Sequence, residues 1–386
     1  MEATAATLAR DADAAAAVGD APRARALLER LVAMMPADNT HWLKLAGMCR
    51  AMGDSEAAMR AVRGALAAAP LDFTALLLHA SLLDRAGDPE ADMAFDRALA
   101  QRPSGALPPP MAAMAQHAES RRQAYLDRRG VRLLQATASV EARLDPDERR
   151  RLARFRSNVL RQTRPYHSEP THFHYPGLVE REFHDRQDFP WLAALEAATE
   201  AIREEFQAVA TAERAQLVPY IQYADHEPLQ QWRALNHNRD WTAIHLIQNG
   251  EVIDANARHC PRTVNLLRTL PQPHIAGCSP NAMFSLLAPK VTIPPHTGVA
   301  NTRLVCHLPL IVPDGCWFRV GAETREWHVG QAFVFDDTIE HEACNPTDQL
   351  RVVLIVDVWH PGLRSGERHA VQSVMEAEVI GATRGL

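Results

Sequence analysis

The sequence predicts an α+β chain in which paired N-terminal helices precede an antiparallel β domain of jelly-roll or barrel type. A Gly-Asp dipeptide recurs every 34 residues through the first hundred residues, which is typical of stacked helical hairpins. After Ala282 come short β-branched runs at 303–312, 332–336 and 351–359, each bounded by Pro, Gly or Asp, as closely spaced strands are. Because no long helices alternate with these strands, a parallel Rossmann-like sheet is not predicted.

Composition limits the class of protein. The 386 residues leave room for two domains, and 47% hydrophobic with 23% charged residues is a globular composition. A net charge of -6 argues against a nucleic-acid partner, and no apolar run approaches the roughly 20 residues that span a bilayer. The opening MEATAATLARDADAAAA lacks the basic-then-apolar order of a signal peptide, and the six cysteines form no CxxC pair. We therefore expect a soluble cytoplasmic protein.

The N-terminal repeat combines glycines that end one helix with prolines that follow the next. Its landmarks are Gly19-Asp20, Gly53-Asp54 and Gly87-Asp88, with Pro36, Pro70 and Pro103 at nearly the same period. Between them lie alanine-rich amphipathic runs such as EAAMRAVRGALAAAP. This spacing resembles the tetratricopeptide repeat family. An alanine-rich helical bundle without a binding function is the alternative.

Three segments follow from changes in composition. Residues 1–105 form the tetratricopeptide-like repeats, and the run Leu107–Pro110 breaks the helical pattern because proline cannot continue it. Residues 106–165 are then expected to be a helical linker with arginine-rich solvated faces. Residues 166–386, richer in aromatics, His and Pro, form the third segment, which carries the strands.

Two of the expected strands carry strong polar groups on one face only. Successive side chains of a strand point to opposite faces, so Arg303 shares a face with His307 while the other face of that strand is apolar. Arg351 likewise shares a face with Asp357 on an otherwise apolar strand. A buried guanidinium needs an anionic partner, and a carboxylate-bearing ligand is the natural candidate.

Two histidines complete a pattern that suits non-haem iron. His341 follows His296 by 45 residues, and Arg351 follows His341 by ten. Imidazole is a good ligand for Fe(II), and a cation on the next strand would bring a 2-oxo acid beside the metal. With 18 histidines in the chain, this spacing alone leaves a structural role open.

Longer motifs identify a family. The stretches HTG, NTRLVCHL, FDDTIEHE and RVVLIVDVWHP, with FHYPGL, DFPWL and CPRT upstream, resemble the aspartyl/asparaginyl β-hydroxylase family over roughly residues 170 to 362. The resemblance implies a double-stranded β-helix (jelly-roll, cupin-like) catalytic domain at 166–386. It also implies an Fe(II)- and 2-oxoglutarate-dependent dioxygenase that uses O2.

The same resemblance assigns roles to individual residues. His296 and His341 would be the iron ligands. Arg351 would form a bidentate ion pair with the distal carboxylate of 2-oxoglutarate, with Ser285 adding a hydrogen bond to it. His307 would contact the carboxylate nearer the metal.

Several positions are left open by the resemblance. Gly298 stands where related oxygenases place an acidic third ligand, so water would fill that place, and Val305 replaces a second basic residue found in some members. Arg303 would pair either with a substrate carboxylate or with nearby acids. Asp336 and Asp337 would orient the second histidine or cap a turn.

The implied reaction is hydroxylation of the β-carbon of Asp or Asn in a peptide or protein, which the helical repeats would help to dock. The alternatives are the same chemistry on a lipid or small molecule, and a repeat scaffold that binds without catalysis. A zinc- or manganese-dependent cupin-like isomerase or hydrolase is a further alternative, and it would not need Arg351.

Overall fold

The chain folds into two compact units, Met1–Gln162 and Thr163–Leu386. This computed structural model describes residues 4–212, 218–222, 233 and 236–381. In this part of the chain every helix is too short or too polar to cross a bilayer.

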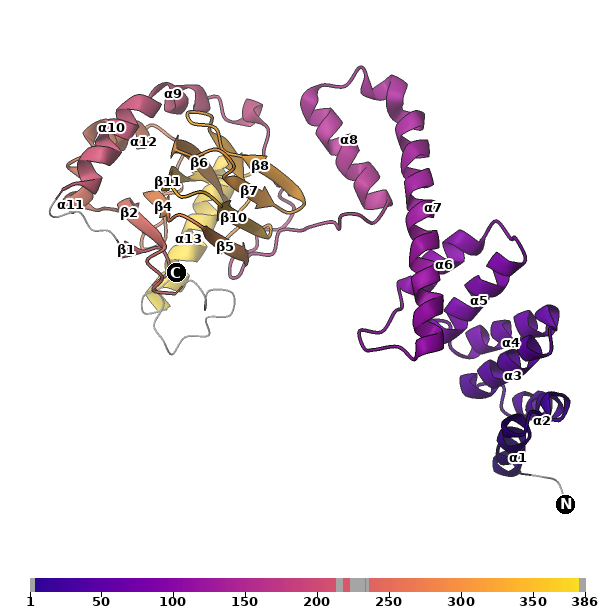
Figure 1. The fold of residues 1–386 in the computed structure, drawn as a ribbon. Coiled ribbons are helices and arrows are strands. Elements are labelled where there is room, and N and C mark those ends of the chain that lie inside the picture. The colour runs from indigo at the N-terminus through magenta and orange to yellow at the C-terminus, as the bar shows by residue number, and fades with distance from the viewer. Residues whose placement is uncertain (1–3, 213–217, 223–232, 234–235, 382–386) are drawn as a thin grey trace. The chain divides into compact units, whose positions relative to one another are not determined.

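The first unit is helical throughout and begins with antiparallel helix pairs (Figure 1). Its helices are α1 (Ala5–Ala17), α2 (Ala21–Met34), α3 (Asn39–Ala51), α4 (Ser55–Ala68), α5 (Phe73–Arg85), α6 (Ala91–Leu99), α7 (Pro109–Glu141) and α8 (Pro146–Val159). The predicted helical repeats are confirmed.

The glycine and the aspartate of the Gly-Asp dipeptide have different structural roles. Gly19, Gly53 and Gly87 take positive φ values of 81°, 78° and 68°, a left-handed conformation that lets the chain turn after the first helix of a pair. In the first two hairpins the aspartate that follows caps the next helix: Asp54, for example, accepts a hydrogen bond from the backbone N–H of Ala57 at 2.9 Å. In the third, Asp88 instead accepts from the backbone N–H of Glu90, the residue before α6.

Small side chains allow the repeat helices to approach closely. Ala46 on α3 and Ala58, Ala61 and Ala65 on α4 are all buried.

The last two helices of this unit pack less closely. The first half of α7 packs against α6, where Arg121 is paired with Asp92. The second half of α7 and the whole of α8 bury none of their side chains, and they are joined by pairs such as Arg156 with Glu141.

The second unit is built on antiparallel strands with short covering helices. The strands are β1 (Val218–Pro219), β2 (Trp241–Gln248), β3 (Glu251–Val252), β4 (Ala282–Leu287), β5 (Val291–His296), β6 (Arg303–Ile311), β7 (Trp317–Val320), β8 (Glu323–Glu326), β9 (Phe333–Phe335), β10 (His341–Asn345) and β11 (Arg351–Trp359). The helices are η1 (Arg186–Asp188, a 3-10 turn), α9 (Leu192–Ala197), α10 (Thr199–Ala210), α11 (Asp254–Ala257), α12 (Pro261–Leu267) and α13 (Ser365–Gly381). The predicted antiparallel β domain is confirmed.

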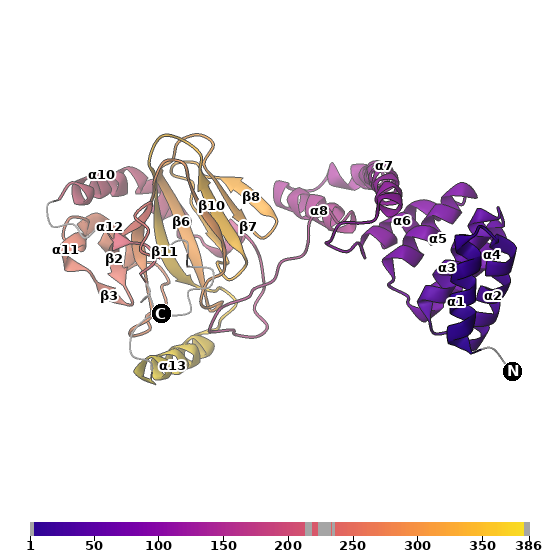
Figure 2. The ribbon, with the colours of Figure 1, turned by 60° about the horizontal axis from the view of Figure 1, so that its bottom comes forward.

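These strands form two sheets. The larger has the order β1-β2-β4-β11-β6-β9, with β3 added beside β2, and the smaller has the order β5-β10-β7-β8. Every strand pair among the described residues is antiparallel. The two sheets face each other (Figure 2), with Phe318 of β7 in contact with Phe335 of β9 at a ring-centroid distance of 4.7 Å.

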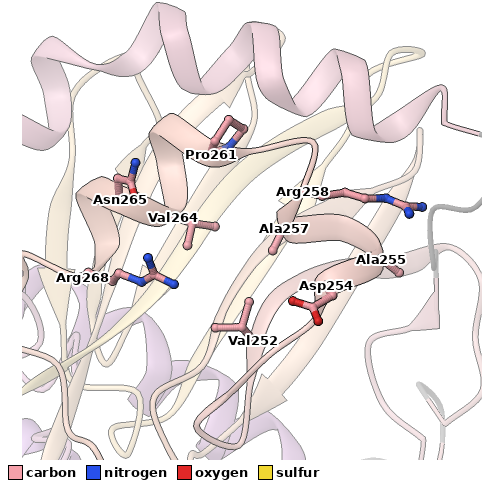
Figure 3. A pocket seen from close by; sticks show the side chains of 9 residues that line it. All are labelled: Val252, Asp254, Ala255, Ala257, Arg258, Pro261, Val264, Asn265 and Arg268. Atoms are coloured by element: carbon pink, nitrogen blue, oxygen red, sulfur yellow. The ribbon is translucent and has the colours of Figure 1, made fainter.

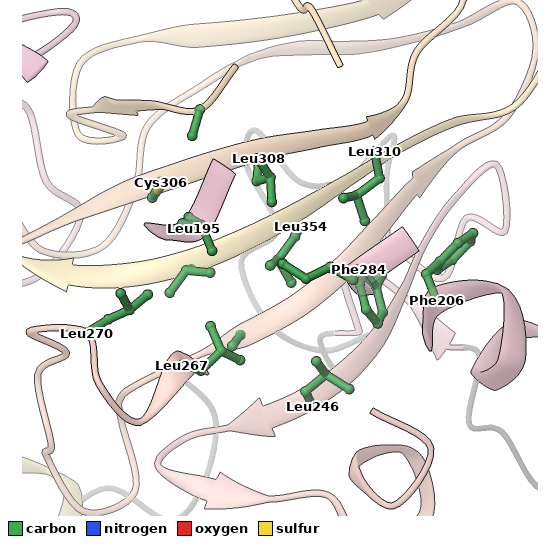
Figure 4. Close-up of a cluster of buried hydrophobic side chains, with 14 of the residues drawn as sticks. Leu195, Phe206, Leu246, Leu267, Leu270, Phe284, Cys306, Leu308, Leu310 and Leu354 are labelled. Carbon is green, nitrogen blue, oxygen red and sulfur yellow. The ribbon is translucent and has the colours of Figure 1, made fainter. Parts of the chain in front are cut away.

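The larger sheet has two chemically different faces. One packs against α9, α10 and α12, where Leu308 and Leu354 lie with Phe206 and Leu267 in a wholly apolar core (Figure 4). The opposite face points toward the smaller sheet and carries the polar residues of β6 and β11 among aromatic side chains. The strict alternation predicted for these two strands is therefore present, and it places their polar groups inside the molecule.

We predict opposite effects of alanine at two helical glycines of the repeats. A Cβ at Gly64 of α4 would lie 2.5 Å from Cε3 of Trp42, so Gly64→Ala should destabilise the helical unit by roughly 1–3 kcal/mol. Gly47 of α3 has open space around it, so Gly47→Ala should stabilise it by about 0.5–1 kcal/mol. Urea unfolding followed by far-UV circular dichroism measures both. Equal effects of the two substitutions would contradict this account of the packing.

Candidate active site

A cavity of about 190 Å³ lies between the two sheets. Its walls include six residues that the sequence singled out: Ser285, His296, Arg303, His307, His341 and Arg351. They come from β4, β5, β6, β10 and β11, so residues up to 66 positions apart meet in one place. Strand pairing within each sheet, together with the packing of the two sheets face to face, brings these residues together.

His296 and His341 form a pair fixed by strand register. His296 ends β5, His341 begins β10, and the two are directly paired with ring centroids 4.0 Å apart. Nδ1 of His296 lies 2.7 Å from the carbonyl oxygen of Pro294, and Nδ1 of His341 lies 3.1 Å from that of Ile339. These carbonyls assign the N–H to Nδ1 in each ring and the lone pair to Nε2.

Burial keeps both rings neutral. It lowers the pKa of His341 to about 4. It also holds the pKa of His296 well below its usual value, with the neighbouring His341 acting in the same direction. Neutral imidazole is the form that binds metal ions, so the pair is in its ligating state at pH 7.

Gly298 lies against an acidic side chain. A Cβ at Gly298 would overlap the carboxylate of Asp337, and the Gly298 N–H donates to the Asp337 carbonyl oxygen at 2.7 Å. In the parts of the chain that the structure describes, no cluster of three or more His, Cys, Asp or Glu side chains is arranged to hold a metal. The carboxylate that lies nearest Gly298 is that of Asp337, in the loop before β10.

Arg303 is partly buried between two acids. Its Nη1 lies 3.0 Å from Asp337 and 3.6 Å from Asp357. Burial alone would lower the pKa of Arg303, but the two carboxylates outweigh it and raise the pKa above the usual value. Asp357 is itself held by Asn281, whose backbone N–H and side-chain Nδ2 donate to it at 2.8 and 3.0 Å. The expected ion pair with nearby acids is thus present, while Arg303 still faces the cavity.

The acid next to Asp337 has a turn-capping role. Asp336 accepts a hydrogen bond from the backbone N–H of Thr338 at 2.9 Å. Burial raises the pKa of Asp336 to about 7. Asp336 therefore fits the turn-cap alternative, whereas Asp337 points its carboxylate at Gly298 and Arg303.

Arg351 is a buried cation without a carboxylate partner among the described residues. Only 2% of it is exposed, and its Nη1 lies 3.3 Å from both the carbonyl and the Oγ of Ser285. Its Nε has no partner, and burial lowers its pKa to about 10. Nearby, Nδ1 of His307 also lacks a partner, and burial with the adjacent Arg351 lowers the pKa of this imidazole. Unsatisfied buried donors of this kind indicate an anionic ligand.

The sequence did not indicate the three aromatic residues of the cavity that carry an N–H or O–H group. Tyr220 stacks on Trp241 with ring centroids 3.8 Å apart, and Trp241 donates from Nε1 to Ser285 Oγ at 3.0 Å. Trp327 lies under the guanidinium of Arg351, 4.8 Å from ring centroid to Cζ. All three lie outside the motifs that carry the resemblance, although Trp327 lies only eight residues before the FDDTIEHE motif, which begins at Phe335.

A second hollow, of about 680 Å³, lies over β3, α11 and α12 (Figure 3). The ionisable side chains in its wall are Asp254, Arg258 and Arg268. Its lining residues include no imidazole or thiol that could bind a metal. The cavity between the sheets is therefore the stronger candidate for chemistry.

Comparison with known proteins points to one family. The profile described as Aspartyl/Asparaginyl beta-hydroxylase matches residues 196–361. The human aspartyl/asparaginyl beta-hydroxylase is 34% identical over 142 residues, which are 36% of this chain and 18% of that protein. The human aspartate beta-hydroxylase domain-containing protein 2 is 38% identical over 141 residues, 35% of this chain and 37% of that protein.

A bacterial relative is covered more fully. The ornithine lipid ester-linked acyl 2-hydroxylase of Rhizobium tropici is 32% identical over 216 residues, which are 55% of this chain and 72% of that protein. The chain thus spans well under half of the two human relatives and most of the bacterial one. All three relatives carry hydroxylase names.

We predict that removing the unpaired cation stabilises the ligand-free protein. Arg351→Met replaces a buried charge with an apolar side chain of similar length and should raise the free energy of unfolding by roughly 1–4 kcal/mol. Arg319→Met is the matched control: it removes the cation that pairs with Glu340 and Glu342, of which only Glu340 keeps a second partner, Arg164, so stability should fall. Urea unfolding followed by tryptophan fluorescence measures both. Destabilisation by both substitutions would show that Arg351 is already satisfied within the protein.

Proposed function

We propose that this chain, which belongs to the aspartyl/asparaginyl β-hydroxylase family, is an Fe(II)- and 2-oxoglutarate-dependent dioxygenase that hydroxylates the β-carbon of Asp or Asn in a peptide or protein. The two facing sheets would form the double-stranded β-helix of such an enzyme. One observation carries the proposal: two neutral, register-paired histidines share a buried cavity with an arginine that has no carboxylate partner among the described residues.

His296 and His341 would hold the metal through their Nε2 atoms. Both rings are already neutral and oriented by backbone carbonyls, so binding would need neither proton loss nor large rotation. No carboxylate ligand can come from Gly298. Asp337, next to that glycine, would instead position a water molecule in the place of the third ligand.

The anionic cosubstrate would occupy the other end of the cavity. Arg351 would pair with its distal carboxylate, aided by the hydroxyl proton of Ser285, and His307 would donate to the carboxylate nearer the metal. Val305 contributes only an apolar wall, so charge complementarity rests chiefly on Arg351.

Bound iron would supply the oxidative decarboxylation of 2-oxoglutarate by dioxygen, coupled to hydroxylation of a substrate C–H bond. The protein's own contribution is placement and exclusion of water. Phe318 and Phe335 pack beside His341 and keep the cavity apolar between its two polar ends. Arg303, held by its two acids, would orient a polar group of the substrate.

The substrate class is the less constrained part of the proposal. Helical repeats commonly offer an extended groove to a peptide, which favours a peptide or protein. The bacterial relative, of which this chain covers 72%, is named for hydroxylating an acyl chain of a lipid, and this favours a lipid as the second candidate. Both candidates use the same metal and cosubstrate residues.

The direct test is an anaerobic titration of the full chain with Fe(II) and 2-oxoglutarate, followed by the weak visible metal-to-ligand absorption band. We expect the band for the unmodified protein and its loss in His341→Ala. In Arg351→Ala, half-saturation should need at least tenfold more 2-oxoglutarate, because a charge-assisted pair is lost.

His369→Ala is the matched control for the loss of an imidazole. His369 is exposed on α13 and lies outside the cavity, so this variant should give the same band as the unmodified protein. Iron binding without any response to 2-oxoglutarate would remove the dioxygenase proposal. It would favour a metal-dependent isomerase or hydrolase instead.

A second prediction tests whether the Asp337 carboxylate beside Gly298 takes part in metal binding. The methyl group of Gly298→Ala would displace the Asp337 carboxylate, and metal affinity should fall roughly 10–100-fold. Gly366→Ala, with open space around it, is the matched control and should bind normally. Equilibrium dialysis against Zn(II) and Fe(II) measures the affinities. Unchanged affinity in Gly298→Ala would mean that Asp337 has no part in the metal site.

A further inference from the structure

Trp327 carries a buried hydrogen-bond donor that the described residues do not use. The residue is only 4% exposed, and its indole Nε1 has no hydrogen-bond partner. An indole N–H can only donate, so no rearrangement of its own proton would satisfy it. Leaving such a donor buried and unpaired is unfavourable, so an acceptor supplied by a ligand is the natural explanation.

The position of Trp327 in the fold limits what that acceptor is. Trp327 lies in the connection that runs from β8 of the smaller sheet to β9 of the larger one. Gly330 anchors this connection by donating from its N–H to the carbonyl of Pro309 on β6, at 3.0 Å. The ring is one wall of the cavity that holds the paired histidines.

The side chains around the ring fix it next to a positive charge. Phe318 stacks on Trp327 with centroids 5.3 Å apart and planes 27° apart, and the guanidinium of Arg351 lies over the ring at 4.8 Å. His307 lies 6.1 Å from it, centroid to centroid. A cation above an indole face is a favourable contact that holds both groups in place.

Besides Arg303, whose guanidinium is paired with Asp337, three residues that line the cavity have a buried side-chain nitrogen without a hydrogen-bond partner: Arg351 (Nε), His307 (Nδ1) and Trp327 (Nε1). The nitrogens of Arg351 and Trp327 can only donate, and Nδ1 of His307 donates in the tautomer that carries the proton there. In the described part of the chain no acidic side chain is paired with Arg351, so this guanidinium has no carboxylate of its own, whereas Arg303 has two. A ligand carboxylate would satisfy several of these donors at once.

We propose that Trp327 is a further cosubstrate-binding residue, whose indole N–H donates to the carboxylate of 2-oxoglutarate that Arg351 pairs with. This inference rests on the proposed function and deepens it. It gives the distal carboxylate one neutral donor besides the guanidinium and Ser285. Trp327 would also add a donor for the cosubstrate in a chain that has the apolar Val305 in place of a second basic residue.

The test uses the full chain labelled with 15N-tryptophan, loaded with Zn(II) as a diamagnetic substitute for Fe(II). The sequence contains seven tryptophans, and the signal lost in Trp327→Phe identifies the Trp327 indole N–H. We expect this signal to move downfield on addition of 2-oxoglutarate and to stay in place with 2-oxobutanoate, which lacks the distal carboxylate. Calorimetric titration should show at least tenfold weaker 2-oxoglutarate binding in Trp327→Phe.

Trp359→Phe is the matched control. Trp359 also lies beneath an arginine, Arg368, at 5.7 Å from ring centroid to Cζ, but it is outside the cavity. Its substitution should leave 2-oxoglutarate affinity unchanged. Should Trp327→Phe fail to fold, a crystal structure of the unmodified protein with Zn(II) and 2-oxoglutarate gives the same answer: Nε1 is expected within about 3.2 Å of a distal carboxylate oxygen.

The outcomes separate this inference from the function on which it rests. If the unmodified protein binds 2-oxoglutarate while the Trp327 signal stays still and Trp327→Phe binds equally well, Trp327 has no such role and the dioxygenase proposal stands. A shift that persists with 2-oxobutanoate overturns the assignment to the distal carboxylate. If the unmodified protein does not bind 2-oxoglutarate at all, the proposed function itself fails.

Discussion

The pairing of β6 with β11 at the centre of the larger sheet determines on which side of that sheet the polar groups of these two strands lie. His307 is directly opposite Ile355, and Val305 is opposite Asp357. Because successive side chains alternate between faces, this register sends Arg303, His307 and Arg351 toward the smaller sheet and leaves the other face apolar. A slip of one residue in either strand would bury these polar groups against α10 and expose the core to the cavity.

In the smaller sheet, too, strand register determines which side chains meet in the cavity. The β5–β10 register pairs His296 with His341, and Phe318 on the adjacent β7 contacts both His341 and His307. The two sheets therefore supply different parts of one cavity: the paired imidazoles of His296 and His341 come from the smaller sheet, and the guanidinium groups, with His307, come from the larger one. Neither sheet alone would bring the paired histidines near the buried Arg351.

Much of the fold could be predicted from local sequence patterns. The alternation of a strand depends on neighbouring residues, and the 34-residue helical period depends on a short repeated pattern. The faces of β6 and β11 and the glycine turns of the repeats are of this kind. The ion pairs of Arg303 could not be predicted in detail, because Asp337 and Asp357 reach it from separate segments through tertiary packing. Trp327 was missed for a related reason: its importance lies in an unpaired N–H, which only three-dimensional surroundings reveal.

The two-faced larger sheet also bears on how such a protein can diverge. Side chains that face α9, α10 and α12 contribute only to folding stability, and none of them lines the cavity. Those on the opposite face contact whatever the cavity binds. The two sets can therefore accumulate substitutions almost independently, one limited by packing volume and the other by ligand chemistry. A fold partitioned in this way can keep its stability while its substrate changes, which agrees with relatives named for hydroxylating amino-acid residues and lipid acyl chains alike.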